Sequence, residues 1–449
     1  MKLWDKGTNE VSKEIETYTV GRDRELDLLL APFDVYGSMA HATMLESIGL
    51  LTKPELDQLL AELKNILGVI NAGDFAIEDG IEDVHSQVEL LLTRKLGDTG
   101  KKIHSGRSRN DQVLVDLRLF IRDEIQTITE LVGDLFHTLN GLSKKHKDIL
   151  IPGYTHLQVA MPSSFGLWFG AYAESLTDDL QLLLAAYKIA NQNPLGSGAG
   201  YGSSFPLDRQ MTTDLLGFED LSYNVVYAQM SRGKVEKSVA FAMSSIAATL
   251  SRMSMDICLY NSQNFGFLKL PVEMTTGSSI MPHKKNPDVF ELIRAKMNKL
   301  QSLSNEVTLI TTNLPSGYHR DMQTIKETFL PAFAELKSTL EVCTFAMKNI
   351  EVKSDIIDDS KYNDLFSVEE VNRLVNEGVP FRDAYIQVGQ AIEEGGTTLN
   401  KSVNHTHLGS IGNPANDEIE NKLKNVLNGF GFKKADDAIG RLVNYPVTT

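Results

Sequence analysis

Cysteine is scarce in this sequence, with only Cys258 and Cys343 among 449 residues. Both lie far apart, in segments whose apolar spacing predicts helices. Such a pair offers neither a disulfide framework nor a clustered cysteine metal site. The fold must therefore be held by an ordinary apolar core, for which a hydrophobic content of 42% is sufficient.

An excess of positive charge is also lacking. Lysine and arginine number 44 against 59 aspartates and glutamates, which gives a formal net charge of −15. Because phosphate groups are bound by excess Lys and Arg, this composition excludes general affinity for nucleic acid or an anionic membrane. An anionic small-molecule substrate would have to be met by a local cluster of cations.

Long apolar runs are absent as well. No stretch is long and uncharged enough to cross a bilayer, and the N-terminal segment has no apolar core of signal-peptide length. We therefore expect a cytoplasmic protein without a membrane partner.

What the sequence does contain is sustained helical periodicity. Between residues 117 and 142, apolar side chains recur every three or four positions, which is typical of a long packed helix. We expect an all-α protein built on a bundle of about five long helices between residues 110 and 350. The further long helices are predicted at 165–190, 235–260, 290–310 and 324–350, and shorter ones at 38–50, 53–72 and 83–96. The predicted helical domains are 1–104, 105–354 (the bundle) and 355–449.

The segment GSSIMPHKKNPD, residues 277–288, is predicted to be a loop that leads into a helix. Its glycine and prolines suit neither a helix nor a strand. It offers Ser278 or Ser279 as a base or nucleophile, cations at Lys284 and Lys285, and the Asn286 amide. These groups suit an anionic intermediate, although a lysine-bearing surface loop with a helix cap would have the same composition.

A second polar segment, HSGRSRNDQV, places Arg107, Arg109 and Asn110 around a Ser-Gly turn. It could be a solvated basic turn with Asn110 or Asp111 capping the next helix. Arginine forks also bind carboxylates bidentately, so the segment could equally recognise a dicarboxylate.

Two histidines stand in other polar segments. His156 lies in IPGYTHLQVAMP, where Pro and Gly alone would turn the chain between helices, and His85 lies in EDVHSQVE. Glu82 and Asp83 would raise the pKa of His85 if they contacted it. Both histidines could instead be structural. A glycine-rich stretch at 193–206 follows a predicted helix rather than a strand, so it is not a dinucleotide fingerprint.

Three of these segments carry a family resemblance. GSSxMPxKxNP resembles the signature loop of the fumarase/aspartase superfamily, GYTHLQ resembles its second signature region, and HSGRSRNDQ is similar to HTGRSRNDQ of the argininosuccinate lyases. The resemblance implies elimination of fumarate from a succinyl-containing substrate, argininosuccinate, through a carbanion and without a metal or cofactor. Sibling succinyl-amine lyases such as adenylosuccinate lyases, and inactive crystallin-like homologues, stay as alternatives.

The resemblance also implies individual roles. Ser278 would abstract the proton, Lys284 and Asn286 would hold the charged intermediate, and His156 would protonate the leaving nitrogen. Glu291 would orient that histidine. The substrate-contacting positions implied by the resemblance are Arg109, Asn110, Thr155, Tyr318, Gln323 and Lys326, with His85 in a motif that closes the site.

The family pattern further implies a homotetramer whose active sites each draw on three chains. Antiparallel helices put successive loops at opposite ends of a bundle, which agrees with this expectation. The sequence departs from the pattern at His283, at His319-Arg320 and at Asp23. Asp23 would add negative charge beside the substrate unless Arg22 or Arg24 neutralised it.

Overall fold

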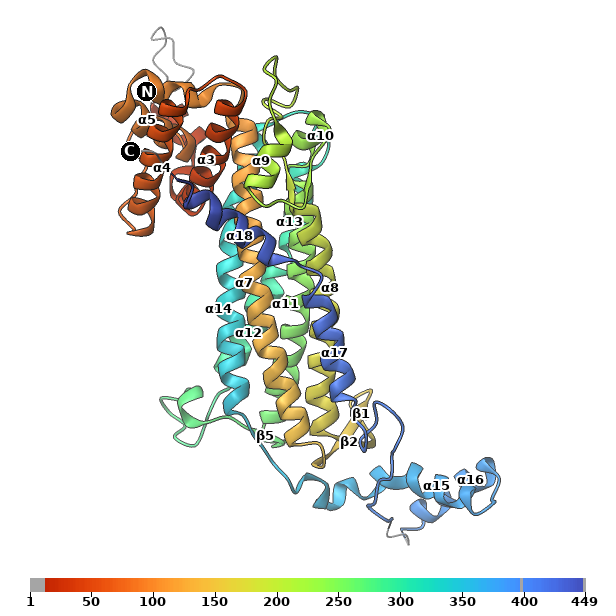
Figure 1. Ribbon diagram of the computed structural model, residues 1–449. Helices are drawn as coiled ribbons and strands as arrows, with labels where there is room; N and C mark the ends of the chain where they lie inside the picture. The colour runs from red at the N-terminus through yellow and green to blue at the C-terminus, as the bar shows by residue number, and fades with distance from the viewer. Residues whose placement is uncertain (1–12, 396–398, 447–449) are drawn as a thin grey trace.

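The computed structural model describes residues 13–395 and 399–446. This part of the chain is helical apart from short two-stranded sheets, so the predicted all-α class is confirmed (Figure 1). The molecule is elongated. A bundle of long helices carries a cluster of shorter helices at one end and a projecting helix pair at the other (Figure 1). Among the described residues, no helix has both the length and the apolarity that crossing a membrane requires.

The bundle is formed by the long helices that the periodicity predicted, with one exception. The segment 290–310 is not one helix, because it is interrupted at Gln301 and Ser302. The Ser302 hydroxyl donates to the Lys299 carbonyl at 2.7 Å, which competes with continued helical bonding. The bundle helices are α7 (Arg109–Lys145), α8 (Phe165–Ala190), α11 (Lys234–Asn261), α12 (Asp288–Leu300), α13 (Leu303–Thr311) and α14 (Ile325–Asn349).

The bundle core follows the predicted stripe of α7. Ile121, Ile125, Ile128 and Val132 are fully buried, and α7 packs against α8 and α14. Burying each such side chain contributes about 1.5–3 kcal/mol before the entropy of ordering is subtracted. The stripe thus fixes which face of α7 is turned inward along its length.

The start of α7 is fixed by Ser108 rather than by the caps expected from the sequence. Ser108 is the N-cap, and its side chain accepts a hydrogen bond from the backbone amide of Asn110. In return, the Asp111 carboxylate accepts a hydrogen bond from the Ser108 amide at 2.8 Å, which completes a capping box. The other oxygen of Asp111 accepts the amides of Gly196 and Gly198 at 3.0 and 2.8 Å. Burial raises the pKa of Asp111 to about 6. One carboxylate therefore joins the first turn of α7 to the glycine-rich connection.

The shorter helices gather around this end of α7 (Figure 1). Helix α4 begins at a capping box between Thr52 and Glu55, and Asp83 caps α5 by accepting the Ser86 amide at 2.9 Å. The helices of this end are α1 (Lys13–Val20), α2 (Asp23–Leu26), α3 (Ala31–Ser47), α4 (Lys53–Asn71), α5 (Val84–Leu96), α6 (Asp98–Lys101), α9 (Arg209–Leu215) and α10 (Val225–Met230).

The connection between α7 and α8 is a β-hairpin rather than a plain turn. Its strands, β1 (Leu150–Thr155) and β2 (Gln158–Ser164), are joined by His156 and Leu157, whose φ angles are 55° and 60°. Two-residue hairpin turns with both residues left-handed normally use Asn or Gly. The other strands are β3 (Gln192–Asn193) with β4 (Asp220–Leu221), parallel, and β5 (Leu268–Lys269) with β6 (Glu351–Val352), antiparallel.

The C-terminal helices separate in space. Helices α15 (Ser367–Asn376) and α16 (Phe381–Glu393) pack on each other away from the bundle, whereas α17 (Asn416–Leu427) lies along α7 and α8 (Figure 1). Helix α18 (Phe432–Val443) continues to α3 and α9. The described residues after 355 thus do not form one compact cluster, and the three-domain division stays a prediction.

Close packing of α18 depends on Gly217, which has a φ of +66°. A Cβ there would lie 2.6 Å from Cβ of Ala438, so Gly217→Ala should cost about 2–4 kcal/mol from left-handed strain plus overpacking. Gly431→Ala is a matched control, since Gly431 also has a φ of 66° but nothing within 4 Å of an added Cβ. Denaturant unfolding should show a clearly smaller loss, about 1 kcal/mol, for the control. Equal losses would contradict the packing argument.

Candidate active site

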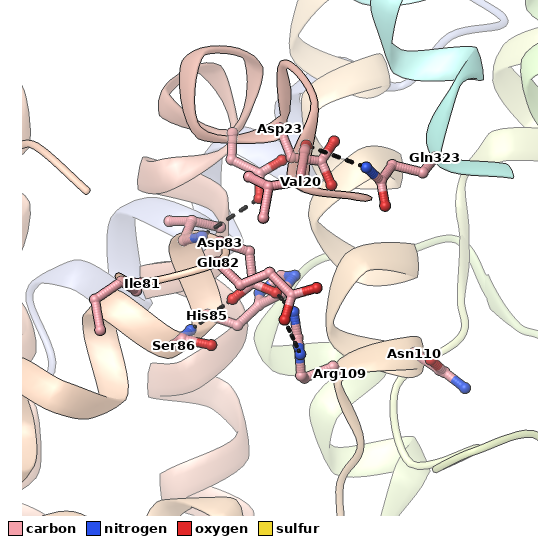
Figure 2. A network of polar contacts seen from close by, with 12 residues as sticks. Val20, Asp23, Ile81, Glu82, Asp83, His85, Ser86, Arg109, Asn110 and Gln323 are labelled. Atoms are coloured by element: carbon pink, nitrogen blue, oxygen red, sulfur yellow. Dashed lines mark hydrogen bonds and ion pairs between the residues drawn. The ribbon is translucent and has the colours of Figure 1, made fainter. Parts of the chain in front are cut away.

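A cavity of about 150 Å³ lies where the α2 segment, the EDVH segment, the start of α7 and the residues before α14 meet. It brings together six residues that the resemblance implied, from segments far apart in the chain. These residues are His85, Arg109, Asn110, Tyr318, Gln323 and Lys326. Figure 2 labels His85, Arg109, Asn110 and Gln323 among them.

Arg109 is paired with two carboxylates at this cavity. Its guanidinium donates hydrogen bonds to Glu82, at 3.2 Å, and to Asp83 (Figure 2). Glu82 also accepts a hydrogen bond from Arg320 at 2.8 Å. Burial alone would raise the pKa of Glu82, but the two arginines hold it below its ordinary value. A substrate carboxylate that binds Arg109 must therefore compete with Glu82 and Asp83.

Lys326 is buried and lies between two other carboxylates. Its Nζ is 2.7 Å from Asp27 and 2.9 Å from Asp23. Burial lowers the pKa of Lys326, but both carboxylates together raise it above its ordinary value. Lys326 thus neutralises Asp23, a role for which the sequence had offered only Arg22 or Arg24.

Arg22 pairs with Glu25 at 2.7 Å, and Arg24 donates to the Ile81 carbonyl at 2.6 Å. Gln323 donates to the carbonyls of Thr19 and Val20, at 2.9 and 3.2 Å (Figure 2). The segment before α2 is thereby attached to the segment before α14, which closes one side of the cavity.

His85 is buried between carboxylates from α3 and α7. Its Nδ1 lies 2.7 Å from Asp34 and 3.3 Å from Asp116. Burial lowers the pKa of His85, but Asp34 and Asp116 together raise it above its ordinary value. The neighbours expected from the sequence, Glu82 and Asp83, pair with Arg109 instead.

The ligand atoms of Asp34, His85 and Asp116 lie within 4.8 Å of one another, as a metal site would require. Burial raises the pKa of Asp116, whereas His85 holds that of Asp34 below its ordinary value against the effect of burial. The positive charge of Arg107 acts on both carboxylates, which disfavours a second cation. His85 Nδ1, the atom that would bind the metal, is also hydrogen-bonded to Asp34. The cluster therefore suits a shared proton better than an ion.

The remaining residues implied by the resemblance do not line this cavity. Thr155 and His156 are exposed at the tip of the β1–β2 hairpin, at the opposite end of the bundle (Figure 1). His156 holds a left-handed conformation that costs a non-glycine residue about 1 kcal/mol or more. Such strain at an exposed histidine is typical of functional sites.

The segment 277–288 is a loop, as predicted. It is closed at its base by a pair of backbone bonds between Thr276 and Asn286. Within it, the Ser278 hydroxyl oxygen accepts the amide of Met281 at 3.2 Å, and Lys284 is exposed. Glu291 is exposed on the first turn of α12.

The length of α7 separates the two groups of residues. Asn110 is in its first turn, whereas the hairpin with His156 follows its last turn. A helix of 37 residues is about 55 Å long. Within one chain, the cavity residues cannot reach the substrate atoms that His156 would protonate.

Sequence reasoning missed Asp27 at the cavity and the two carboxylates beside His85. Asp27, Asp34 and Asp116 lie in helical segments in which a charged residue is ordinarily solvent-facing. The available signal was the interruption of an apolar face by an acid, for example Asp116 between Val115 and Leu117.

Comparison with known proteins identifies the family of this chain. A family model described as lyase matches residues 3–301. A protein of Parabacteroides distasonis named argininosuccinate lyase is 66% identical over 443 residues, covering 99% of both chains. Another of that name, from Thermotoga neapolitana, is 41% identical, covering 87% of this chain and 98% of the other. The chain belongs to the argininosuccinate lyase family.

Solved structures support the same fold for this family member. An EDDS lyase variant with bound fumarate has a TM-score of 0.76 at 21% identity, covering 97% of each chain. A class II fumarase from Schistosoma mansoni has a TM-score of 0.69 at 15% identity, covering 92% of this chain and 95% of the other. The fumarase/aspartase-like helical fold expected from the signature segments is thereby confirmed.

The carboxylates around His85 should respond differently to substitution. The pKa of Asp116 is raised well above its ordinary value, by burial and by Asp34, whereas that of Asp34 is lowered by His85 against the effect of burial. Asp116→Asn imitates a protonated carboxyl and should change the free energy of unfolding by less than about 1 kcal/mol. Asp34→Asn removes the charge that balances His85 and should cost about 3–5 kcal/mol. Urea unfolding at pH 7 measures both, and equal losses would contradict the opposite pKa shifts of the two carboxylates.

Proposed function

We propose that this chain cleaves argininosuccinate reversibly to arginine and fumarate, the last step of arginine biosynthesis, in the cytoplasm. The observation that carries the proposal is 66% identity, over 99% of both chains, to a protein named argininosuccinate lyase. The signature residues Ser278, Lys284 and Asn286 are all present in the loop before α12.

The proposed chemistry is general acid–base elimination. Ser278 removes a proton from the carbon next to a succinyl carboxylate, and the carbanion charge spreads into that carboxylate. The carbon–nitrogen bond then breaks, and His156 supplies a proton to the leaving guanidino nitrogen. Glu291 orients His156.

A serine base needs help, because the unperturbed pKa of its hydroxyl is far above neutral. Backbone amides of Ile280 and Met281 lie 3.4 and 3.2 Å from Ser278 Oγ, where they favour its anionic form. Lys284 and Asn286 would stabilise the negative charge that develops on the substrate.

The proposed active site combines three chains of a homotetramer. One chain would supply the cavity with Arg109 and Asn110, another the Thr155–His156 hairpin, and a third the Ser278 loop. Large apolar side chains exposed along the bundle support its packing against other copies. Examples are Phe241, Leu292, Leu309 and Phe345, each more than half exposed.

The charge of the cavity argues against a nucleotide substrate such as adenylosuccinate. Asp23, Asp27, Glu82 and Asp83 all line it, and they pair with cations of the same cavity. A phosphate group would have to displace these carboxylates from their cations. The retained Ser278 and His156 argue against an inactive crystallin-like protein.

The direct test is fumarate release, followed by ultraviolet absorbance. Purified protein should produce fumarate from argininosuccinate and much less from adenylosuccinate, because only the former offers a zwitterionic amino-acid end to a cavity lined by both carboxylates and cations. Ser278→Ala, which removes the proposed base, is the control for contaminating activity and should lower turnover by at least about a thousandfold. Absence of fumarate with the intact protein would refute the proposed function.

Shared sites predict complementation between inactive variants. Arg109→Ala and Ser278→Ala should each be inactive alone. When the two are denatured together and refolded, about a quarter of the sites in random tetramers should contain both intact residues. Fumarate release should recover accordingly.

A matched control pairs Lys284→Ala with Ser278→Ala, whose positions share one loop and so always come from the same chain. This pair should not regain fumarate release after joint refolding. The outcome that would contradict the proposal is that tetramers of Arg109→Ala and Ser278→Ala are verified to be mixed and yet stay inactive. A site shared between chains in this way would then be ruled out.

A further inference from the structure

A second and larger cavity, of about 410 Å³, lies beneath α18, where that helix crosses α3, α7 and α8. It shares no lining residue with the candidate active site. Asn110 and Arg122, one at each cavity, are about 18 Å apart along α7. The larger cavity therefore has to be explained separately.

Arg122 lines this cavity and is almost fully buried. It donates through Nη1 to the Leu216 carbonyl at 3.0 Å and to Asn191 at 3.4 Å, and its Nε has no hydrogen-bond partner among the described residues. No described carboxylate forms an ion pair with it, and burial lowers its pKa to about 10. The guanidinium also lies over the Phe218 ring, 4.6 Å from its centroid, which compensates part of the cost of burying the charge. A buried guanidinium without an ion-pair partner is still costly, so this site favours an anionic partner.

Tyr187 provides a second unused donor in the same cavity. Its hydroxyl is buried without a hydrogen-bond partner, while its ring packs against Phe430 and Phe432. Buried tyrosine hydroxyls usually find a partner. The Arg122 Nε and the Tyr187 hydroxyl are thus two buried hydrogen-bond donors that are free to bind a ligand in this cavity.

The rim of the cavity carries the opposite charge. Asp123, on α7, and Asp436, on α18, are exposed carboxylates that line it. With Arg122, the lining has one cation and two anions. A ligand with one carboxylate and two cationic groups would balance these charges.

Arg118 shows that a buried arginine alone does not make such a site. Its Nε is also without a partner, but its other nitrogens bind the Gln192 carbonyl and the Ser231 hydroxyl. The space beside Arg118 is only about 10 Å³, too small for more than a water molecule. Of these two arginines, Arg122 alone faces a space of ligand size.

We propose that the cavity beneath α18 binds a free α-amino acid with a cationic side chain. Its carboxylate is held by Arg122 and Tyr187, and its ammonium and side-chain cation pair with Asp123 and Asp436. L-Arginine, the product of the proposed reaction, belongs to this class, but the inference rests on the lining alone. Because α18 lines the cavity and also contacts α3, a bound ligand stabilises the packing of this helix.

Hydrogen exchange on the full-length protein tests the proposal, because it locates binding within the chain. L-Arginine and L-lysine should slow amide exchange in α18. Agmatine, which lacks the carboxylate, and L-norleucine, which lacks the side-chain cation, should need at least about tenfold higher concentrations. Unchanged exchange in α18 up to about 50 mM of either cationic amino acid, far above a millimolar dissociation constant, would overturn the proposal.

Two variants then test the contacts. Tyr187→Phe removes only an unpartnered hydroxyl, and Asp436→Asn removes an exposed charge, so neither should prevent folding. Each should raise the half-maximal amino-acid concentration for α18 protection about tenfold. Asp437→Asn is the matched control, since Asp437 lies on the same helix but pairs with Lys433 at 2.7 Å.

Unchanged protection in both test variants would refute the assigned contacts. Fumarate release, recorded for every protein, reports on the proposed enzymatic activity separately, so the two proposals can fail independently.

Discussion

The rigid length of α7 is the constraint on which the rest of the molecule depends. Its first turn is fixed by Ser108 and Asp111, and its apolar stripe is buried along the bundle axis. The helix therefore cannot bend to bring Asn110 towards His156. Any chemistry that needs both residues must use a second chain, so the bundle that stabilises the fold also makes assembly a condition of activity under the proposed function.

Charge pairing is the second constraint, because the cavity at the start of α7 is lined with both cations and carboxylates before any substrate is present. Arg109 is held by Glu82 and Asp83, and Lys326 by Asp23 and Asp27. These pairs reduce the cost of burying charge, which would otherwise be several kcal/mol per ion. They also place the cations at fixed positions. Substrate binding then exchanges one set of ion pairs for another instead of ordering free side chains.

Much of this architecture could be predicted from sequence because the signals are local. The bounds of α8 follow from the spacing of its apolar residues. The signature loop, residues 277–288, follows from its Gly and Pro residues. The partners of His85 could not be predicted, since Asp34 and Asp116 lie 51 positions before it and 31 positions after it. Only the packing of α3 against α7 brings them together. The left-handed turn at His156 was missed for a related reason, because the strands that impose it override the preference of histidine and leucine for other conformations.

The distribution of charge between the two ends of the bundle bears on substrate choice. Asp23 and Asp27 flank Lys326 at the cavity, whereas Lys284 and Lys285 dominate the exposed signature loop. Argininosuccinate, under the proposed function, has an amino-acid end that carries both charges and a succinyl end that is purely anionic. A mixed acidic and basic cavity suits the first end, and a cationic loop suits the second. Under the proposed function, we expect the departure at Asp23 not to weaken binding of the zwitterionic end, because Lys326 already pairs with its charge.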